Sequence, residues 1–157
     1  MRLYAVQHGE AVDKAVDPER PLSGRGRRDV ERLAAFLARQ DLRRVQVVHS
    51  GKTRAAQTAE LLAWAVRAEP AAPGHPGLGP EDPVEPWVEA LASREDDLLL
   101  VGHLPFLDRL VSALTAGSPE AGVARFVPGT AACLERVEPG AWRLVWLVPP
   151  EVLATEE

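Results

Sequence analysis

The chain has 157 residues, of which 46% are hydrophobic and 26% charged, with a formal net charge of -5 at pH 7. This length suits a single domain, residues 1–157, built around one core. The negative charge, with no continuous basic stripe to offset it, argues against nucleic acid as the main partner. Cys133 is the only cysteine, which excludes an intrachain disulfide. No apolar run reaches the roughly 18 residues that cross a bilayer and no signal peptide is recognised, so we expect no membrane association and a cytoplasmic location.

Strands and helices alternate along the first half of the chain. A strand is predicted over residues 2–6, followed by a polar, proline-containing loop. Ser23 is placed to cap a helix that ends near residue 40, because apolar residues recur there at helical spacing. A second strand over 45–49 turns at residues 50–53 into another amphipathic helix. This order of elements is typical of an α/β protein.

The second half of the chain opens with an irregular connection over residues 68–86, which holds six prolines and three glycines. The remaining predicted elements are a short helix at 87–92, a strand at 98–101, a helix at 107–114, and two strands at 131–137 and 142–148. The last two strands are joined at Pro139-Gly140 and are expected to pair antiparallel. We therefore expect a three-layer α/β/α sandwich with a mostly parallel sheet and an antiparallel C-terminal strand.

Polar side chains follow three of the predicted strands. His8 and His103 each come at a strand end beside a glycine, and the strand that ends at His49 leads within a few residues to Arg54. In an open α/β sheet the carboxyl ends of parallel strands meet at one crevice. If the three strands are neighbours, these side chains converge there, and Arg20 can join them from the first loop.

Two imidazoles and two guanidinium groups in one crevice suit a phosphoryl group. Arginine matches phosphate oxygens with paired, charge-assisted hydrogen bonds. A neutral histidine can attack phosphorus and form a covalent phosphohistidine, and a second one can stabilise charge in the transition state. A metal site is the competing interpretation, but the histidine and carboxylate spacing does not support it and the arginines would repel a cation. We therefore expect neither a metal nor another cofactor.

The spacing of four motifs resembles that of the histidine phosphatase superfamily, the phosphoglycerate mutase-like proteins, and within it the short SixA-type phosphohistidine phosphatases. The motifs are Val6-Gln7-His8-Gly9-Glu10-Ala11, Glu19-Arg20-Pro21-Leu22-Ser23, Ser50-Gly51-Lys52-Thr53-Arg54-Ala55-Ala56-Gln57-Thr58-Ala59 and Val101-Gly102-His103. They occur in the family's order. The resemblance implies a phosphoglycerate mutase-like fold and a phosphatase that needs no metal.

The resemblance also implies roles for individual residues. His8 would be the nucleophile, Arg20 and Arg54 would bind phosphate, and His103 would be the second imidazole on the phosphoryl group. Gly9 would let the backbone approach the ligand closely.

One position departs from the family pattern, which has arginine immediately before the nucleophilic histidine. Here that residue is Gln7, which keeps N–H donors but lacks the charge and the rigid fork. Hydrogen bonds to charged groups contribute roughly 1.5–3 kcal/mol and neutral ones about 1 kcal/mol. A loss of about 1–2 kcal/mol in the transition state slows a reaction roughly 5- to 30-fold. Gln7 would therefore bind phosphate more weakly than arginine does.

A general acid for a departing alkoxide is hard to identify in the sequence. The candidates are Glu10, Asp13, Asp17, Glu81, Asp82 and Glu85, of which we carry forward the last three, and the resemblance assigns the role to none of them. The chain is also too short for the inserted helical lid that shapes the substrate pocket in larger family members. The missing acid favours a protein phosphohistidine as substrate, because an imidazole leaving group can be protonated near neutral pH. The missing lid favours the same substrate, because an open crevice would admit a histidine presented on another protein. A small-molecule phosphomonoesterase and, because of Gln7, a non-catalytic phospholigand-binding domain are the alternatives.

Overall fold

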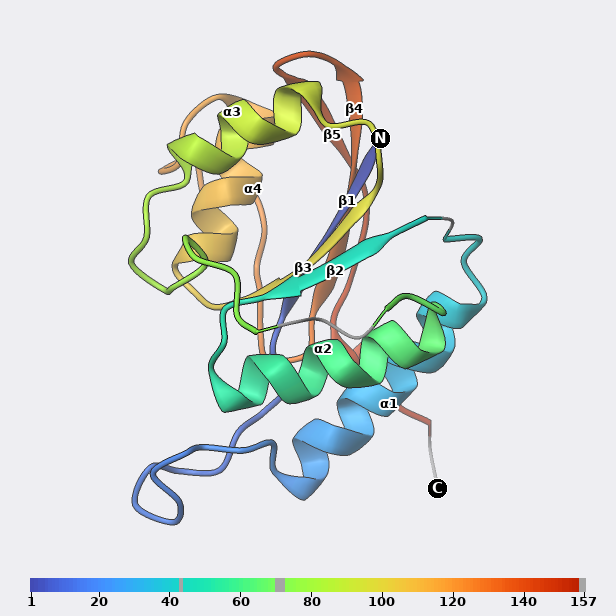
Figure 1. The fold of residues 1–157 in the computed structure, drawn as a ribbon, viewed down its shortest axis with the longest axis vertical. Helices are drawn as coiled ribbons and strands as arrows, with labels where there is room; N and C mark the ends of the chain where they lie inside the picture. The colour runs from blue at the N-terminus through green and yellow to red at the C-terminus, as the bar shows by residue number, and fades with distance from the viewer. Residues whose placement is uncertain (43, 70–72, 156–157) are drawn as a thin grey trace.

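The computed structural model describes residues 1–42, 44–69 and 73–155, which form a five-stranded sheet with helices on both faces (Figure 1). In chain order the elements are β1 (Arg2–Gln7), α1 (Gly24–Ala38), β2 (Gln46–His49), α2 (Thr53–Ala65), α3 (Glu85–Ser93), β3 (Leu98–Gly102), α4 (Phe106–Ala116), β4 (Ala131–Glu138), β5 (Ala141–Val148) and α5 (Pro150–Leu153). The predicted three-layer α/β/α sandwich is confirmed.

The strand order is β2-β3-β1-β4-β5. β1 and β2 both pair parallel to β3, so the carboxyl ends of these three strands lie at the same edge of the sheet. β4 runs antiparallel to both β1 and β5 and is the predicted antiparallel strand. The condition for convergence of the strand ends is therefore met.

The predicted elements agree with the structure within one or two residues, and one short helix was not predicted. α3 begins at Glu85 instead of Trp87, because Pro86 fits the first turn of a helix, where no amide hydrogen is needed. α5 was not predicted, since four residues are too few to show helical periodicity. None of the helices in the described part of the chain has the length and apolar content needed to cross a membrane.

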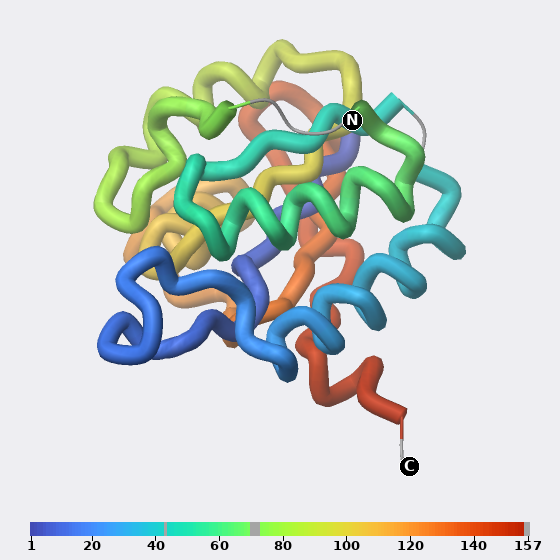
Figure 2. Tube along the Cα trace, turned by 60° about the horizontal axis from the view of Figure 1, so that its bottom comes forward, coloured from blue at the N-terminus to red at the C-terminus, as the bar shows by residue number. Residues whose placement is uncertain are grey.

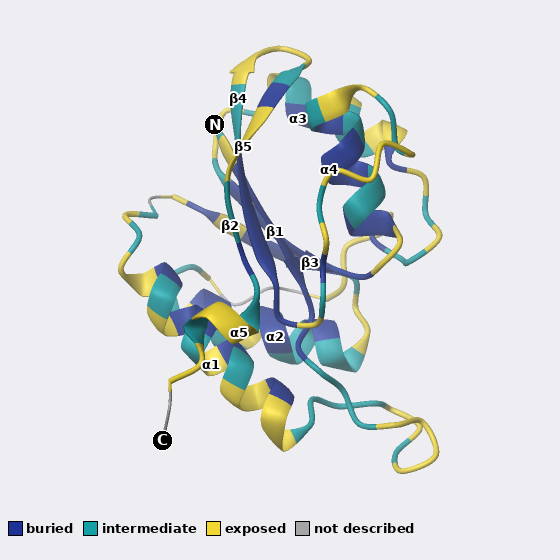
Figure 3. Cartoon of the chain, turned by 180° about the vertical axis from the view of Figure 1, so that it is seen from behind, coloured by how far each residue is buried: buried dark blue, intermediate teal, exposed yellow. Residues whose placement is uncertain are grey.

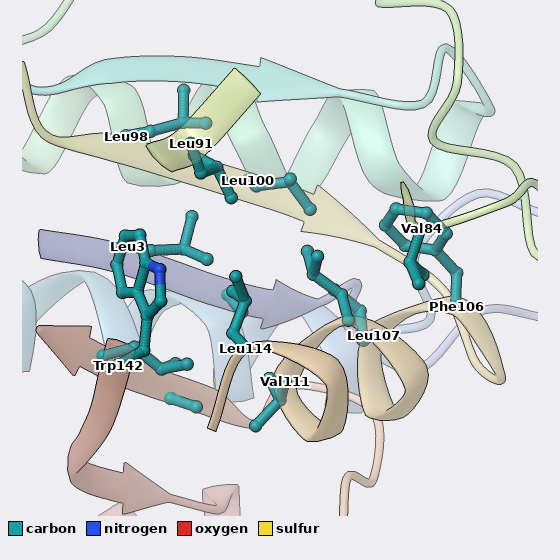
Figure 4. Close-up of a cluster of buried hydrophobic side chains, with 14 of the residues drawn as sticks. Leu3, Val84, Leu91, Leu98, Leu100, Phe106, Leu107, Val111, Leu114 and Trp142 are labelled. Atoms are coloured by element: carbon teal, nitrogen blue, oxygen red, sulfur yellow. The ribbon is translucent and has the colours of Figure 1, made fainter. Parts of the chain in front are cut away.

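The core consists of two clusters, one on each face of the sheet, and alternation along β1 divides its side chains between them. Leu3 and Ala5 join the cluster under α3 and α4, which also contains Phe106 (Figure 4). Tyr4 and Val6 join the cluster under α1 and α2. Figure 3 shows the central strands buried on both faces. This burial fixes the edge where the strands end, and with it the position of the residues that follow them.

The segment after β1 is held against the first turn of α1. The hydroxyl of Ser23 accepts a hydrogen bond from the amide of Gly26 at 3.0 Å, which is the predicted helix cap. The same hydroxyl donates to Oε1 of Glu10 at 3.0 Å. A Cβ at Gly26 would overlap the carbonyl group of Glu10 and lie 2.8 Å from its amide nitrogen. The glycine is therefore required for the close approach of α1 to this segment.

We expect Gly26→Ala to destabilise the fold by about 2–3 kcal/mol, because backbone on both sides must move to admit the methyl group. Gly24→Ala is the matched control in the same helical turn. There the new Cβ would meet only the flexible Arg28 side chain, at 3.5 Å. Urea unfolding of the two variants measures the difference. Equal stabilities would contradict the packing argument.

Candidate active site

The carboxyl edge of the sheet brings together the side chains that the sequence singled out. His8 directly follows β1 and His103 directly follows β3, and their ring centroids lie 4.9 Å apart at an interplanar angle of 51°. Arg54, in the first turn of α2, donates from Nε to Nε2 of His8 at 3.4 Å. The predicted convergence of these three residues is therefore observed.

Hydrogen bonds fix which nitrogen of His8 is free to react. Nδ1 of His8 lies 2.7 Å from the carbonyl oxygen of Gly9. A carbonyl oxygen can only accept, so Nδ1 carries the ring proton. Nε2 therefore holds the lone pair, and it faces the guanidinium group of Arg54. This tautomer presents Nε2 as the nucleophilic nitrogen.

Both site histidines are neutral at physiological pH. Burial, together with the positive charges of Arg54 and Arg20, lowers the pKa of His8 to about 4, although the hydrogen bond to Gly9 acts in the opposite direction. Burial also lowers the pKa of His103 to about 3, with contributions from His8, Arg54, Lys52 and Arg20. An unprotonated His8 keeps its lone pair available for attack on phosphorus.

Thr58 connects the end of β1 to α2. Its hydroxyl accepts from the amide of Gly9 at 3.0 Å and donates to the carbonyl oxygen of Arg54 at 2.8 Å. A Cβ at Gly9 would lie 2.7 Å from Cγ2 of Val30 on α1. Helix packing thus requires the glycine, whereas its predicted role in close approach to phosphate stays a prediction. Together these contacts set the position of His8 relative to Arg54.

The loop after β1 carries Arg20 to the site. Figure 2 shows this loop beside the first turn of α2, where Thr53 donates to Glu19 at 3.4 Å. Arg20 itself adopts a left-handed backbone with φ 47°, and its Nε donates to the carbonyl oxygen of Val12 at 3.1 Å. Arg20 and burial both lower the pKa of Arg54, burial more strongly. The two guanidinium groups therefore share a region of positive potential, as anion binding requires.

Gln7 is the last residue of β1 and is 7% exposed. Its amide nitrogen donates to the carbonyl oxygen of Thr130 at 3.0 Å, and its carbonyl oxygen accepts from Gly129 at 3.1 Å. The side-chain oxygen Oε1 is buried and has no hydrogen-bond partner in the described part of the chain. The residue is thus fixed by its backbone, whereas no contact among the described residues satisfies its side-chain oxygen.

The three candidate acids lie in and next to the segment that precedes α3. Glu81, Asp82 and Glu85 line one pocket together with Pro105, two residues beyond His103. Oδ2 of Asp82 accepts from the amide of Gly79 at 2.7 Å. Among the described residues, none of the three carboxylates forms a hydrogen bond or ion pair with the site histidines or arginines. Their role as an acid remains a prediction.

Sequence reasoning did not assign a role to Ser50, although this residue directly follows β2. Its Oγ lies 2.6 Å from Nε2 of His103 and accepts from the amide of Lys52 at 3.4 Å. The rule that identified His8 and His103, a polar residue at the end of a buried parallel strand, also applies to Ser50. Thr58 gave no such signal, because it lies inside a helix.

Residues suited to hold a metal do not cluster at this edge. Within residues 1–42, 44–69 and 73–155, no group of three or more histidine, cysteine, aspartate or glutamate side chains is placed to coordinate an ion. The charged groups that surround His8 are cationic, and they suit an anion.

Comparison with known proteins agrees with this geometry. The model of the histidine phosphatase superfamily (branch 1) matches residues 3–78. An uncharacterised relative from Picosynechococcus sp. is 34% identical over 124 residues, a match that covers 74% of each chain. The chain belongs to the histidine phosphatase superfamily.

Solved structures place this histidine phosphatase with the SixA type. The protein histidine phosphatase SixA complexed with tungstate gives a TM-score of 0.82 at 27% identity and covers 98% of this chain and 100% of its own. A protein from Agrobacterium tumefaciens assigned as a phosphohistidine phosphatase SixA gives 0.75 at 22% identity and covers 94% of this chain and 96% of its own. A mycobacterial glucosyl-3-phosphoglycerate phosphatase gives a TM-score of 0.67 at 18% sequence identity. The match covers 92% of this chain and 96% of the phosphatase. These matches confirm the phosphoglycerate mutase-like fold, and membership of the superfamily supports phosphatase activity.

We expect the ring signals of His8 and His103 in NMR titrations to stay constant between about pH 8 and pH 5. Protonation should follow near pH 4 and pH 3, because burial and nearby cations disfavour the charged ring. Arg20→Gln removes one of these cations and should raise both midpoints. A His8 midpoint near the ordinary value of about 6.5 would contradict this account.

Proposed function

We propose that this histidine phosphatase removes the phosphoryl group from protein phosphohistidine through a covalent intermediate on Nε2 of His8, with no metal or other cofactor. The observation that carries the proposal is the state of His8. Its proton is held on Nδ1 by the carbonyl oxygen of Gly9, and its unprotonated Nε2 faces Arg54. A fixed, neutral nucleophile beside a cation is the arrangement that attack on a phosphoryl group needs.

In the first step Nε2 of His8 forms a bond to phosphorus as the phosphorus–nitrogen bond of the substrate breaks. When the second ring nitrogen of the substrate histidine already carries a proton, its imidazole leaves as a neutral group. No enzymatic acid has to supply a proton in this case. The unassigned role of Glu81, Asp82 and Glu85 is therefore compatible with this substrate class.

In the second step a water oxygen bonds to phosphorus and the bond to His8 breaks. Both water protons leave with inorganic phosphate, and His8 returns to the neutral form with its proton on Nδ1. In both steps Arg20, Arg54 and Gln7 bind phosphoryl oxygens, and His103 donates a hydrogen bond to the charge that develops. The cationic groups lower the barrier because they bind this charge more strongly in the transition state.

A protein substrate is favoured by the architecture around His8. The connections over residues 10–22 and 73–84 are irregular segments and do not form a helical cover. The first of these holds Arg20 at the site, and the second lies against the end of β2, where the amide of His75 donates to the carbonyl oxygen of His49 at 2.8 Å. The similar structure of SixA is that of a protein histidine phosphatase. The proposed reaction belongs to signal transduction by protein phosphorylation in the cytoplasm.

The second candidate is hydrolysis of a small phosphomonoester. Its support is the pocket beside Pro105, where Glu81, Asp82 or Glu85 could protonate a departing alkoxide. The similar fold of glucosyl-3-phosphoglycerate phosphatase shows that this architecture also occurs in a phosphatase of a small molecule. A non-catalytic phospholigand-binding domain is the third candidate, motivated by Gln7.

We expect His8→Ala to abolish metal-free turnover of a phosphoramidate, with a loss of roughly 10³-fold or more, because the covalent route is then closed. His75→Ala is the matched control, since this exposed ring packs against Trp87 and makes no contact with His8. Assays with phosphoramidate and with p-nitrophenyl phosphate, each with EDTA, measure both variants. An acid-labile phosphoryl label on the wild-type protein, absent from His8→Ala, would identify the intermediate.

The same assays separate the three candidates. Faster turnover of phosphoramidate than of p-nitrophenyl phosphate supports the phosphohistidine proposal, and the reverse order supports the phosphomonoesterase. Vanadate binding with no turnover of either compound supports the binding domain. Turnover that persists in His8→Ala would rule out His8 as the nucleophile.

We expect Gln7→Arg to raise kcat/KM for phosphoramidate by roughly 5- to 30-fold, because a charged, forked donor replaces a neutral one. Gln7→Met, which has a similar volume but no donor and only a weakly accepting sulfur, should lower kcat/KM. Steady-state kinetics at one ionic strength measure both effects. An unchanged or lower rate in Gln7→Arg would show that glutamine is no handicap at this position.

A further inference from the structure

Two buried side-chain atoms in the described part of the chain have no hydrogen-bond partner, and both lie at this site. They are Oε1 of Gln7 and Nδ1 of His103. The two residues are 7% and 2% exposed, so water at the surface does not compensate for the missing partners. Gln7 directly precedes His8 in the chain, and the ring of His103 lies 4.9 Å from that of His8. Buried polar atoms are almost always paired, so two exceptions in the residues next to His8, one adjacent in the chain and one in ring contact, indicate a ligand that pairs with them.

The main-chain groups of Gln7 are both hydrogen-bonded, so the missing hydrogen bond belongs to its side-chain amide. Its main-chain N–H and C=O are bonded to Thr130 and Gly129. In the family pattern an arginine occupies this position, and an arginine offers donors only. The glutamine differs in that it brings a hydrogen-bond acceptor to the site and adds no charge. In this orientation of the amide, Oε1 needs a hydrogen that the ligand carries.

The unpartnered nitrogen of His103 has the opposite character. Nε2 of this ring lies 2.6 Å from Oγ of Ser50, and the amide of Lys52 donates to the same oxygen. We assign the proton of this contact to the Ser50 hydroxyl, which can accept from Lys52 and donate to Nε2 of His103 at the same time. A neutral ring then carries its own proton on Nδ1, which becomes a free donor. The site thus offers one unpartnered acceptor and one unpartnered donor.

We infer that the site selects the singly protonated, monoanionic form of the phosphoryl group. Its P–OH donates to Oε1 of Gln7, and one of its unprotonated oxygens accepts from Nδ1 of His103. The fully ionised dianion has only acceptor oxygens, so it would direct a lone pair at the buried Oε1 and leave this atom unpaired. The inference rests on the proposed function in one respect, that the phosphoryl group binds beside His8.

The charges around the site leave the ligand as the group that titrates near neutral pH. The pKa values of His8 and His103 lie near 4 and 3, well below that range. Arg54 on α2, Lys52 directly before this helix and Arg20 in the loop supply the positive charge. On the α4 side, Asp82 accepts from Gly79, and Asp108 accepts from the hydroxyl of Ser112 at 3.3 Å. A pH dependence of binding between pH 6 and pH 8 therefore reports mainly the protonation state of the ligand.

Isothermal titration calorimetry with inorganic phosphate tests the inference, because phosphate passes from monoanion to dianion near neutral pH and is not turned over. At constant ionic strength we expect the Kd of the wild-type protein to rise with pH, approaching about tenfold per unit once the monoanion is the minor form. In Gln7→Arg the rise should disappear, since arginine bonds to either form. Gln7→Met should bind more weakly and also lose the pH dependence. It is the second variant in case the buried arginine disturbs folding.

A wild-type Kd that is constant or falls with pH would overturn the inference, as would an equal slope in Gln7→Met or no phosphate binding at any pH. These outcomes are independent of turnover. A steep slope without hydrolysis of phosphoramidate would contradict the proposed function and leave the selectivity in place. Hydrolysis through His8 with no slope would contradict the selectivity alone.

Discussion

The hydrogen bond from Nδ1 of His8 to the carbonyl oxygen of Gly9 sets the chemistry of this site. It leaves the lone pair on Nε2, which faces Arg54. The carbonyl is itself held in place, because the amide of Gly9 is bonded to Thr58 and helix α1 approaches so closely that a Cβ at Gly9 would clash with Val30. The orientation of His8, the proposed nucleophile, is therefore fixed before any ligand binds, and reorganisation during the proposed reaction is small.

The electrostatics of the site follow from the same packing. Burial at the sheet edge and the neighbouring guanidinium groups keep the imidazoles of His8 and His103 neutral, whereas Arg20 and Arg54 remain charged. A neutral nucleophile within a cationic site suits the attack on an anion, because the cations attract the phosphoryl group and do not protonate the attacking nitrogen. Gln7 modifies this arrangement, since it adds an acceptor where the family pattern has a third cation.

Much of the fold could be predicted from local sequence signals. Ser23 caps α1 as its spacing indicates, and the continuous apolar run at 98–101 forms a central strand. The periodicity that predicts a helix is weaker where the helix is short or has a proline in its first turn. This explains the missed α5 and the earlier start of α3. The candidate acids illustrate another limit, because Glu81 and Asp82 lie in an irregular segment, and its path, which also sets where α3 begins at Glu85, depends on distant packing.

The sequence by itself determined which residue types follow each strand and in what order they occur. That information was enough to identify His8, Arg20, Arg54 and His103 and the resemblance to a phosphatase family. Only the tertiary structure decided that β3 lies between β1 and β2, which places the histidine rings in contact. The tautomer of His8, the role of Ser50 and the unpartnered atoms of Gln7 and His103 also required it. The physical reason is that strand order, burial and hydrogen-bond partners arise from contacts between residues far apart in the chain, which no local pattern records.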